Sequence, residues 1–174
     1  VQAEDPYFLW NSLHALDQEG EYFFDMQGVS GPPFMLYLWA PQGQSPETME
    51  VEMRRRDYAF NFNWVSNIMV RNLSFHGAGI QCPPSSSSIA IEDLTMKYCG
   101  RGLDTLANAA RAAIWLKGAD HSVRNCDIEA SYGGGILTLG TGTQITNNVV
   151  NDCMLYSIGT WHSSNIAVTH NTTY

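Results

Sequence analysis

The chain has 174 residues, of which 44% are hydrophobic and 15% charged, so it is long enough to bury a core of domain size. Its formal net charge of -8 argues against a nucleic-acid or anionic-membrane partner, because clustered Lys and Arg side chains bind such partners. No apolar run reaches the roughly 20 residues that a membrane-spanning helix needs, so a membrane partner is not expected either.

Residues 1–65 show no internal repeat, and we expect them to form a helix and β lead-in that packs on the rest of the chain. Apolar residues within 6–16 follow a nearly helical spacing, and Gly20 follows as a stop. This pattern predicts a short N-terminal helix.

Strand-like runs follow this helix. Residues 21–25 and 34–39 are apolar or alternating runs on either side of a glycine- and proline-rich stretch, which predicts a β-hairpin. Residues 49–53 alternate Met, Glu and Val, and predict one further strand.

From residue 66 to residue 174 the pattern repeats. Five apolar residues are separated by 21, 32, 22 and 23 positions, namely Val70, Ile91, Val123, Ile145 and Val168. A period in the low twenties, made of short strands, is typical of a β-solenoid whose coils each add a strand to every sheet. The 32-residue repeat contains an Ala-rich insertion at 100–111, which we expect to project as a loop or short helix.

Two further sets of residues recur at a constant distance from the five reference residues. A polar residue stands two positions after each reference residue, giving Asn72, Asp93, Asn125, Asn147 and His170. Three positions later stand Phe75, Met96, Ile128, Val150 and Thr173, which should return to the core. Asn and Asp tolerate the left-handed conformation that a sharp corner needs, so the polar column predicts a corner with side chains hydrogen-bonded from coil to coil.

The four cysteines allow two disulfides, one metal site or free thiols, and they are Cys82, Cys99, Cys126 and Cys153. No pair has the C-x-x-C spacing that holds zinc locally. We therefore favour free thiols packed in the core and expect no metal site.

Four runs, LDQEGEYFFD (16–25), LYLWAP (36–41), RDYAF (56–60) and IMVRNLSF (68–75), resemble the entry into the right-handed parallel β-helix of secreted carbohydrate-active proteins. That group includes β-helical glycoside hydrolases and pectate-lyase-like proteins. The resemblance implies an all-β, right-handed parallel β-helix, a secreted or extracellular location, and a polysaccharide or oligosaccharide partner. Its members are several times longer and this chain stops in mid-coil, so we expect it to be part of a larger polypeptide.

Carboxylates on an exposed sheet face are the candidate catalytic groups. Glycoside hydrolysis needs an acid and a base about 5–5.5 Å apart for retention, or about 6.5–9.5 Å apart for inversion. Asp127 and Glu129 fall at outward positions after the polar corner, and Asp152 lies near the equivalent place one coil later. These three are the predicted catalytic residues, and ordinary solvated acids are the alternative.

Aromatic side chains predict a sugar-binding surface, because the C–H face of a sugar ring stacks on exposed Trp and Tyr rings. If Leu116, Leu139 and Thr160 face inward, the outward positions are Trp115, Thr138 and Gly159 on one side and Lys117, Gly140 and Trp161 on the other. The predicted substrate-binding residues are Trp115, Trp161, His162, Tyr132 and Lys117. The alternative is that the 100–111 insertion covers Trp115.

His121 stands two positions before Val123, in a column of mostly apolar residues, and is expected to face inward with a hydrogen-bond partner.

The leading hypothesis is part of a glycoside hydrolase that acts on a plant or microbial polysaccharide. A noncatalytic carbohydrate-binding or structural β-helix is the alternative, because fold alone does not decide function. A polysaccharide lyase is the further alternative. It would need Ca²⁺ held by an Asp cluster, and the sequence shows no such cluster. No other cofactor is expected.

Overall fold

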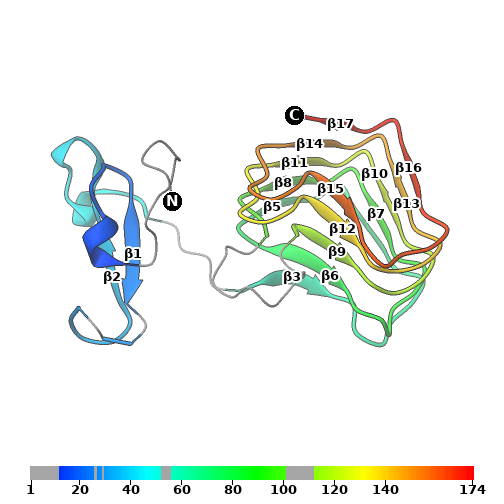
Figure 1. Cartoon of the computed structure of the whole chain (residues 1–174), viewed down its shortest axis with the longest axis horizontal. Helices are drawn as coiled ribbons and strands as arrows, with labels where there is room; N and C mark the ends of the chain where they lie inside the picture. The colour runs from blue at the N-terminus through cyan, green and yellow to red at the C-terminus, as the bar shows by residue number, and fades with distance from the viewer. Residues whose placement is uncertain (1–11, 26, 29, 52–55, 101–111) are drawn as a thin grey trace, which may run out of the picture. The chain divides into compact units, whose positions relative to one another are not determined.

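The computed structural model describes residues 12–25, 27, 28, 30–51, 56–100 and 112–174. The chain divides into two compact units, residues 1–52 and 53–174, and each is described by itself (Figure 1). Among the described residues no helix is long and apolar enough to cross a membrane.

The first unit contains the predicted hairpin. Strands β1 (Tyr22–Asp25) and β2 (Met35–Leu38) pair antiparallel, which confirms the prediction. The buried carboxylate of Asp25 accepts hydrogen bonds from the backbone N–H groups of Gly28 and Ser30, both at 2.7 Å. These bonds hold the chain where it turns away from β1.

The predicted N-terminal helix is wrong for the part that the structure describes. Residues 1–11 lie outside the described residues, and the remainder forms only a 3-10 helix, η1 (Leu13–Ala15). Leu16 already has an extended conformation. The carboxylate of Glu21 then accepts hydrogen bonds from two backbone N–H groups of the following turn, which favours that turn over a further helical turn.

The predicted strand at 49–53 is also wrong where it is described. Two 3-10 helices, η2 (Pro41–Gly43) and η3 (Pro46–Thr48), lead into residues 49–51, which have no regular structure, and the last two residues lie outside the described part. Thr48 bonds to the Ser45 carbonyl through both its N–H and its hydroxyl, so a tight turn ends directly before this segment. Alternation alone does not make a strand without a partner.

The second unit is a parallel β-solenoid of about five coils, and it contains three five-stranded sheets (Figure 1). The first sheet consists of β3 (Tyr58–Asn61), β6 (Gly79–Cys82), β9 (Ile114–Leu116), β12 (Ile136–Thr138) and β15 (Ile158–Thr160). The second consists of β4 (Met69–Arg71), β7 (Ala90–Glu92), β10 (Ser122–Arg124), β13 (Gln144–Thr146) and β16 (Ala167–Thr169). The third consists of β5 (Ser74–His76), β8 (Thr95–Lys97), β11 (Asp127–Glu129), β14 (Val149–Asn151) and β17 (Thr172–Thr173).

The predicted repeat register is confirmed. The five reference residues are paired from strand to strand across the second sheet, and so are the residues of the Phe75 column across the third sheet. Most members of both columns are fully buried, and they form the core together with inward residues of the first sheet. Val168, on the last coil, is exposed. β3 also belongs to the stack, because it pairs in parallel with β6.

The predicted polar corner is confirmed as well. All five residues of that column have a positive φ, with values of 55°, 52°, 54°, 57° and 56° from Asn72 to His170. Two other corners also repeat a positive φ, at Asn67, Ser88, Asp120, Gly142 and Asn165, and at Gly77, Tyr98, Ala130 and Asp152. The insertion lies outside the described residues from 101 to 111.

The cysteines are free thiols. Cys82, Cys99 and Cys126 are buried, and Cys153 is half-buried. Burial raises the pKa of Cys82 to about 12 and that of Cys126 to about 11, so both stay protonated and behave as small apolar core residues.

Candidate saccharide-binding surfaces

The predicted site residues lie on two different sheets of the solenoid. Trp115 belongs to β9, and Lys117 and Trp161 directly follow β9 and β15, all in the first sheet. Asp127 and Glu129 belong to β11 in the third sheet. The structure therefore does not bring these two acids onto the face that presents the tryptophans.

The expected inward file of the first sheet is wrong by one residue on one coil. Leu116 pairs with Thr138 and not with Leu139, and Thr138 pairs with Thr160. Thr138 is fully buried, and its hydroxyl lies 3.4 Å from that of Thr143 in the core. A threonine can point inward here because its one polar atom finds a partner there.

This register changes the outward positions of β12. Leu137 takes the place expected for Thr138, and Leu139 takes the place expected for Gly140. The backbone N–H groups of residues 117, 139 and 161 each bond to the neighbouring coil at an equivalent place. We call the resulting surface the tryptophan face, and it consists of Trp115, Lys117, Leu139, Gly159 and Trp161. Leu137 is in the outward file of Trp115 and Gly159 but is buried, with 4% exposure.

Two pairs of side chains organise the tryptophan face. The Lys117 ammonium lies 5.8 Å from the centroid of the Trp115 ring, which is within cation–π range. At the other end, Trp161 is 54% exposed and its ring lies 5.2 Å from that of His162. The Trp115 Nε1 is buried and has no hydrogen-bond partner among the described residues. Residues 101–111 of the insertion, which was the alternative expected to cover Trp115, lie outside the described residues.

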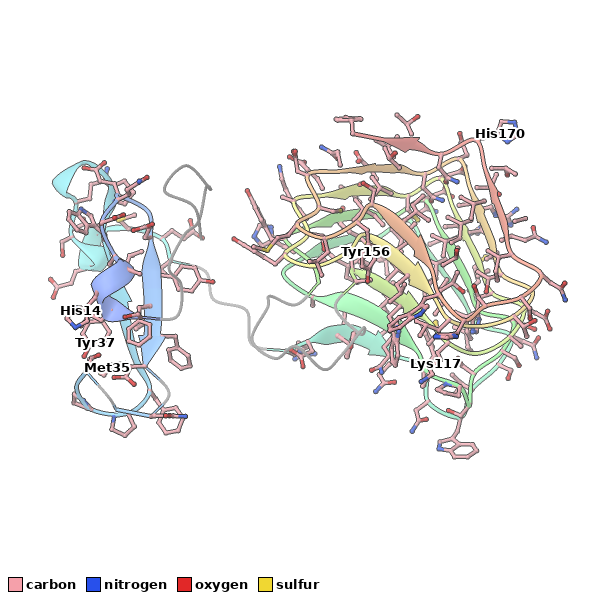
Figure 2. All side chains as sticks on the ribbon, in the orientation of Figure 1. His14, Met35, Tyr37, Lys117, Tyr156 and His170 are labelled. Carbon is pink, nitrogen blue, oxygen red and sulfur yellow. The ribbon has the colours of Figure 1, made fainter. Side chains whose placement is uncertain are left out.

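Tyr156 packs beside the tryptophan face, and Figure 2 labels it with Lys117. A Cβ at Gly134 would lie 2.0 Å from the Tyr156 ring, and a Cβ at Gly159 would lie 3.2 Å from it. The ring therefore rests directly on the backbone at both glycines. This packing adds an aromatic edge to the apolar strip around Leu137.

The predicted acids occupy the third sheet. Asp127 is exposed and Glu129 half-buried, and both point outward from β11 as expected, because Ile128 between them is buried. The Glu129 carboxylate forms an ion pair with the Lys97 ammonium on the preceding coil, at 2.9 Å. Hydrogen bonding and the negative charge of Glu129 raise the pKa of Lys97.

Asp152 lies one position beyond the outward file. Glu129 pairs with Asn151, so the residue equivalent to Asp152 on the preceding coil is Ala130. Asp152 is exposed, has a φ of 51°, and accepts a hydrogen bond from the Asn151 side chain at 3.3 Å.

Tyr132, one of the predicted substrate-binding residues, lies in a row of aromatic rings beside these acids and not with the tryptophans, and the other two rings of the row, His76 and Tyr98, were not predicted. The His76 and Tyr98 rings are 5.1 Å apart and meet edge to face, and the Tyr98 and Tyr132 rings are 6.3 Å apart. The Lys97 ammonium lies 5.8 Å from the Tyr98 centroid. We call His76, Tyr98 and Tyr132 the tyrosine row. Extending the register by one outward position beyond Phe75 would have found His76.

His121 faces inward as expected. It is buried, its Nδ1 accepts a hydrogen bond from the Ile89 N–H at 3.2 Å, and its Nε2 lies 3.4 Å from the Ser86 hydroxyl. Burial lowers the pKa of His121 to about 4, against a smaller opposing effect of Asp120. His121 is thus a neutral core residue at neutral pH.

No protein-family model, curated protein or solved structure matches this chain. Among the described residues, no three His, Cys, Asp or Glu side chains are grouped as metal ligands. The two surfaces are therefore the features of the chain that bear on its function. Both present exposed aromatic rings next to polar side chains, and such surfaces are suited to stacking and hydrogen bonding with sugars.

Proposed function

We propose that this chain is a polysaccharide-binding β-solenoid of a secreted protein, and that a neutral glycan lies along the tryptophan face. The observation that carries the proposal is the file of Lys117, Leu139 and Trp161 at one outward position of three consecutive coils. Trp161 is half-exposed, and the Leu137 side chain and the Tyr156 ring pack over the backbone at Gly159, two positions earlier, so an apolar surface lies beside the indole. A sugar ring can stack on the indole while its hydroxyls reach His162 and Lys117.

Charge favours a neutral ligand. The chain carries a formal net charge of -8, which opposes a polyanionic substrate such as a polyuronate. Lys117 already interacts with the Trp115 ring. In this proposal the coils wind right-handed, as in the carbohydrate-active β-helices that the sequence resembles.

The test compares two exposed tryptophans of the solenoid. Trp161→Ala removes the platform, whereas Trp64→Ala removes a ring that is 82% exposed at a corner of the first coil. Affinity electrophoresis in gels containing xylan, mannan or mixed-linkage β-glucan measures binding. We expect Trp161→Ala to weaken retention about tenfold and Trp64→Ala to leave it unchanged. A wild-type chain that none of these glycans retards would contradict the proposal.

Glycoside hydrolysis by Asp127 and Glu129 is the second candidate, and their position on one face of β11 favours it. The Cα atoms of residues i and i+2 in a strand are about 6.6 Å apart. This backbone spacing lies near the distance between the two carboxyl groups of inverting enzymes, about 6.5–9.5 Å. Glu129, beside the Lys97 ammonium, would serve as the base and Asp127 as the acid. Asp152 is the third predicted acid, one coil further on.

Sugar release separates hydrolysis from binding. Reducing ends released from the same glycans would be measured for the wild type and for Asp127→Asn, Glu129→Gln and Asp152→Asn. We expect the first two variants to lose at least about a hundredfold in rate if they supply acid and base. No release by the wild type rejects hydrolysis but leaves the binding proposal intact. Release of unsaturated products from polygalacturonate with Ca²⁺ would favour a lyase instead.

A further inference from the structure

We infer that the tyrosine row on the third sheet is a second binding site for a neutral polysaccharide, so that the chain is bivalent. The inference takes its ligand class from the proposed function but depends on different residues. Tyr98 and Tyr132 are 39% and 49% exposed, and His76 is also exposed. None of the three lies on the tryptophan face.

The backbone of the solenoid fixes the spacing of this row. His76 pairs with Lys97, and Lys97 pairs with Glu129, so three consecutive coils are in register beneath the rings. Tyr98 directly follows β8, and the Tyr132 N–H bonds to the Cys99 carbonyl on the preceding coil at 3.2 Å. The rings come from three consecutive coils but from different positions on them, because the register equivalent of Tyr98 is Ala130 and not Tyr132, so the row runs obliquely across the coils with ring spacings of 5.1 and 6.3 Å. An extended glycan along this row meets a new ring at each step.

Polar groups stand directly beside the rings. The side chains of the Lys97–Glu129 ion pair are 42% and 43% exposed, so ammonium donors and carboxylate acceptors remain accessible to a ligand. Asp127 is exposed on the same face of β11. Adjacent sugar hydroxyls both donate and accept hydrogen bonds, and this combination of groups can satisfy them.

The surroundings disfavour other ligand classes. Asp127, Glu129 and Asp152 give this region negative charge, and Lys97 is already paired with Glu129, so a nucleic acid or polyuronate would be repelled. The next outward file is mostly polar or small, with Ser74, Thr95 and Asp127 on the same three coils. A stable protein interface needs a broader apolar centre than one row of rings.

The tryptophan face and the tyrosine row lie on different sheets, so one protein molecule has two separate binding surfaces. One protein molecule can hold two glycan chains, or two stretches of one long chain, and so cross-link them. Binding to a dense polysaccharide then exceeds the affinity of either row for a short oligosaccharide.

The test counts sites with short ligands. Calorimetric titration with xylohexaose, mannohexaose and cellohexaose gives the stoichiometry, and turbidity with the parent polysaccharide measures cross-linking. We expect two sites in the wild type, one in Tyr98→Ala/Tyr132→Ala, and one in Trp161→Ala, with turbidity lost in both variants. Tyr22→Ala is the matched control, because Tyr22 is 63% exposed and belongs to hairpin strand β1 and not to the solenoid. Tyr98→Phe/Tyr132→Phe keeps the rings and should keep both sites.

Each failure has its own pattern. A double alanine variant that is folded by urea titration and still binds two ligands overturns the tyrosine row and leaves the tryptophan face intact. A wild type with a single site that disappears in Trp161→Ala also overturns the tyrosine row and leaves the tryptophan face intact. One wild-type site that disappears only in the double variant instead overturns the proposed function and retains the row. If the row binds polylysine and none of the hexasaccharides, its partner is a cationic peptide and the inference is wrong.

Discussion

Asn147 donates a hydrogen bond from its side-chain amide to the side-chain oxygen of Asn125 on the preceding coil, at 2.8 Å. Asn125 in turn donates to the carboxylate of Asp93 one coil further back, at 3.0 Å. All three residues have a positive φ at the same corner. Asn and Asp side chains at this corner thus supply both the turn and the bond between coils.

Asn125→Ala should lower the free energy of unfolding by about 2–4 kcal/mol. It removes two side-chain hydrogen bonds, worth about 0.5–1.5 kcal/mol each, and places a Cβ-bearing residue without local bonding at a φ of 54°. Asn125→Gly removes the same bonds without the conformational strain, so it should cost about 1–2 kcal/mol less than alanine. Urea unfolding followed by circular dichroism measures both. Equal losses in the two variants would show that φ contributes nothing here.

This corner was predictable because its requirement is local. The left-handed conformation favours Asn or Asp, and four of the five residues at this corner are Asn or Asp, so the column was visible in the sequence at a constant offset from Val70 and its equivalents. The inward file of the first sheet was not predictable in the same way. Thr138 looked like a surface residue, but it is buried because Thr143 is there to bond to it.

A second ladder of hydroxyl groups has one gap. Ser66 and Ser87 hydroxyls lie 2.7 Å apart, and Thr141 and Ser164 hydroxyls lie 3.0 Å apart. Ala119 forms a backbone bridge to both Ser87 and Thr141 but has no hydroxyl. The ladder is therefore interrupted at its middle coil.

Ala119→Ser should stabilise the protein by about 0.5–1.5 kcal/mol, because one new hydroxyl can bond to those of both neighbouring coils. Ala119→Val, which adds methyl groups but no polar atom, is the control and should give no such gain. Thermal unfolding monitored by calorimetry compares the two. A serine variant no more stable than wild type would contradict the expected bonding.

The site was harder to predict than the fold, and the reason is again physical. Asp127 and Glu129 were placed outward correctly, because strand alternation is a local rule. The distance of these two acids from Trp161 depends on which sheet each strand belongs to. The Tyr98 and Tyr132 rings meet only because the coils of the third sheet stack in register. These relations are set by the whole stack.

Asn148 connects three coils inside the core. Its side-chain oxygen accepts from the Cys126 N–H at 2.9 Å, and its amide donates to the Val123 carbonyl at 3.1 Å and to Asn171 at 2.9 Å. Asn148→Ala leaves buried backbone groups without partners, and each costs about 1–3 kcal/mol. We therefore expect a loss of about 3 kcal/mol or more in unfolding free energy. Asn151→Ala is the control, because the half-buried Asn151 side chain bonds to the Asp152 side chain and to no other described residue, and it should cost under about 0.5 kcal/mol.

His121 should make the solenoid sensitive to acid. Its pKa is lowered by burial from 6.5 to about 4, so the folded protein binds fewer protons than the unfolded chain between these two values. Stability from neutral His121 is fully present above pH 6.5 and is lost as pH falls toward 4, at up to about 1.4 kcal/mol per pH unit and roughly 3 kcal/mol in total. His121→Asn has an oxygen that can accept from the Ile89 N–H and no titrating group. Urea unfolding at pH 7, 6, 5 and 4 should therefore give a smaller loss for the variant than for the wild type, the carboxylates being common to both. Parallel curves for the two proteins would show that His121 is protonated in the folded state at no cost.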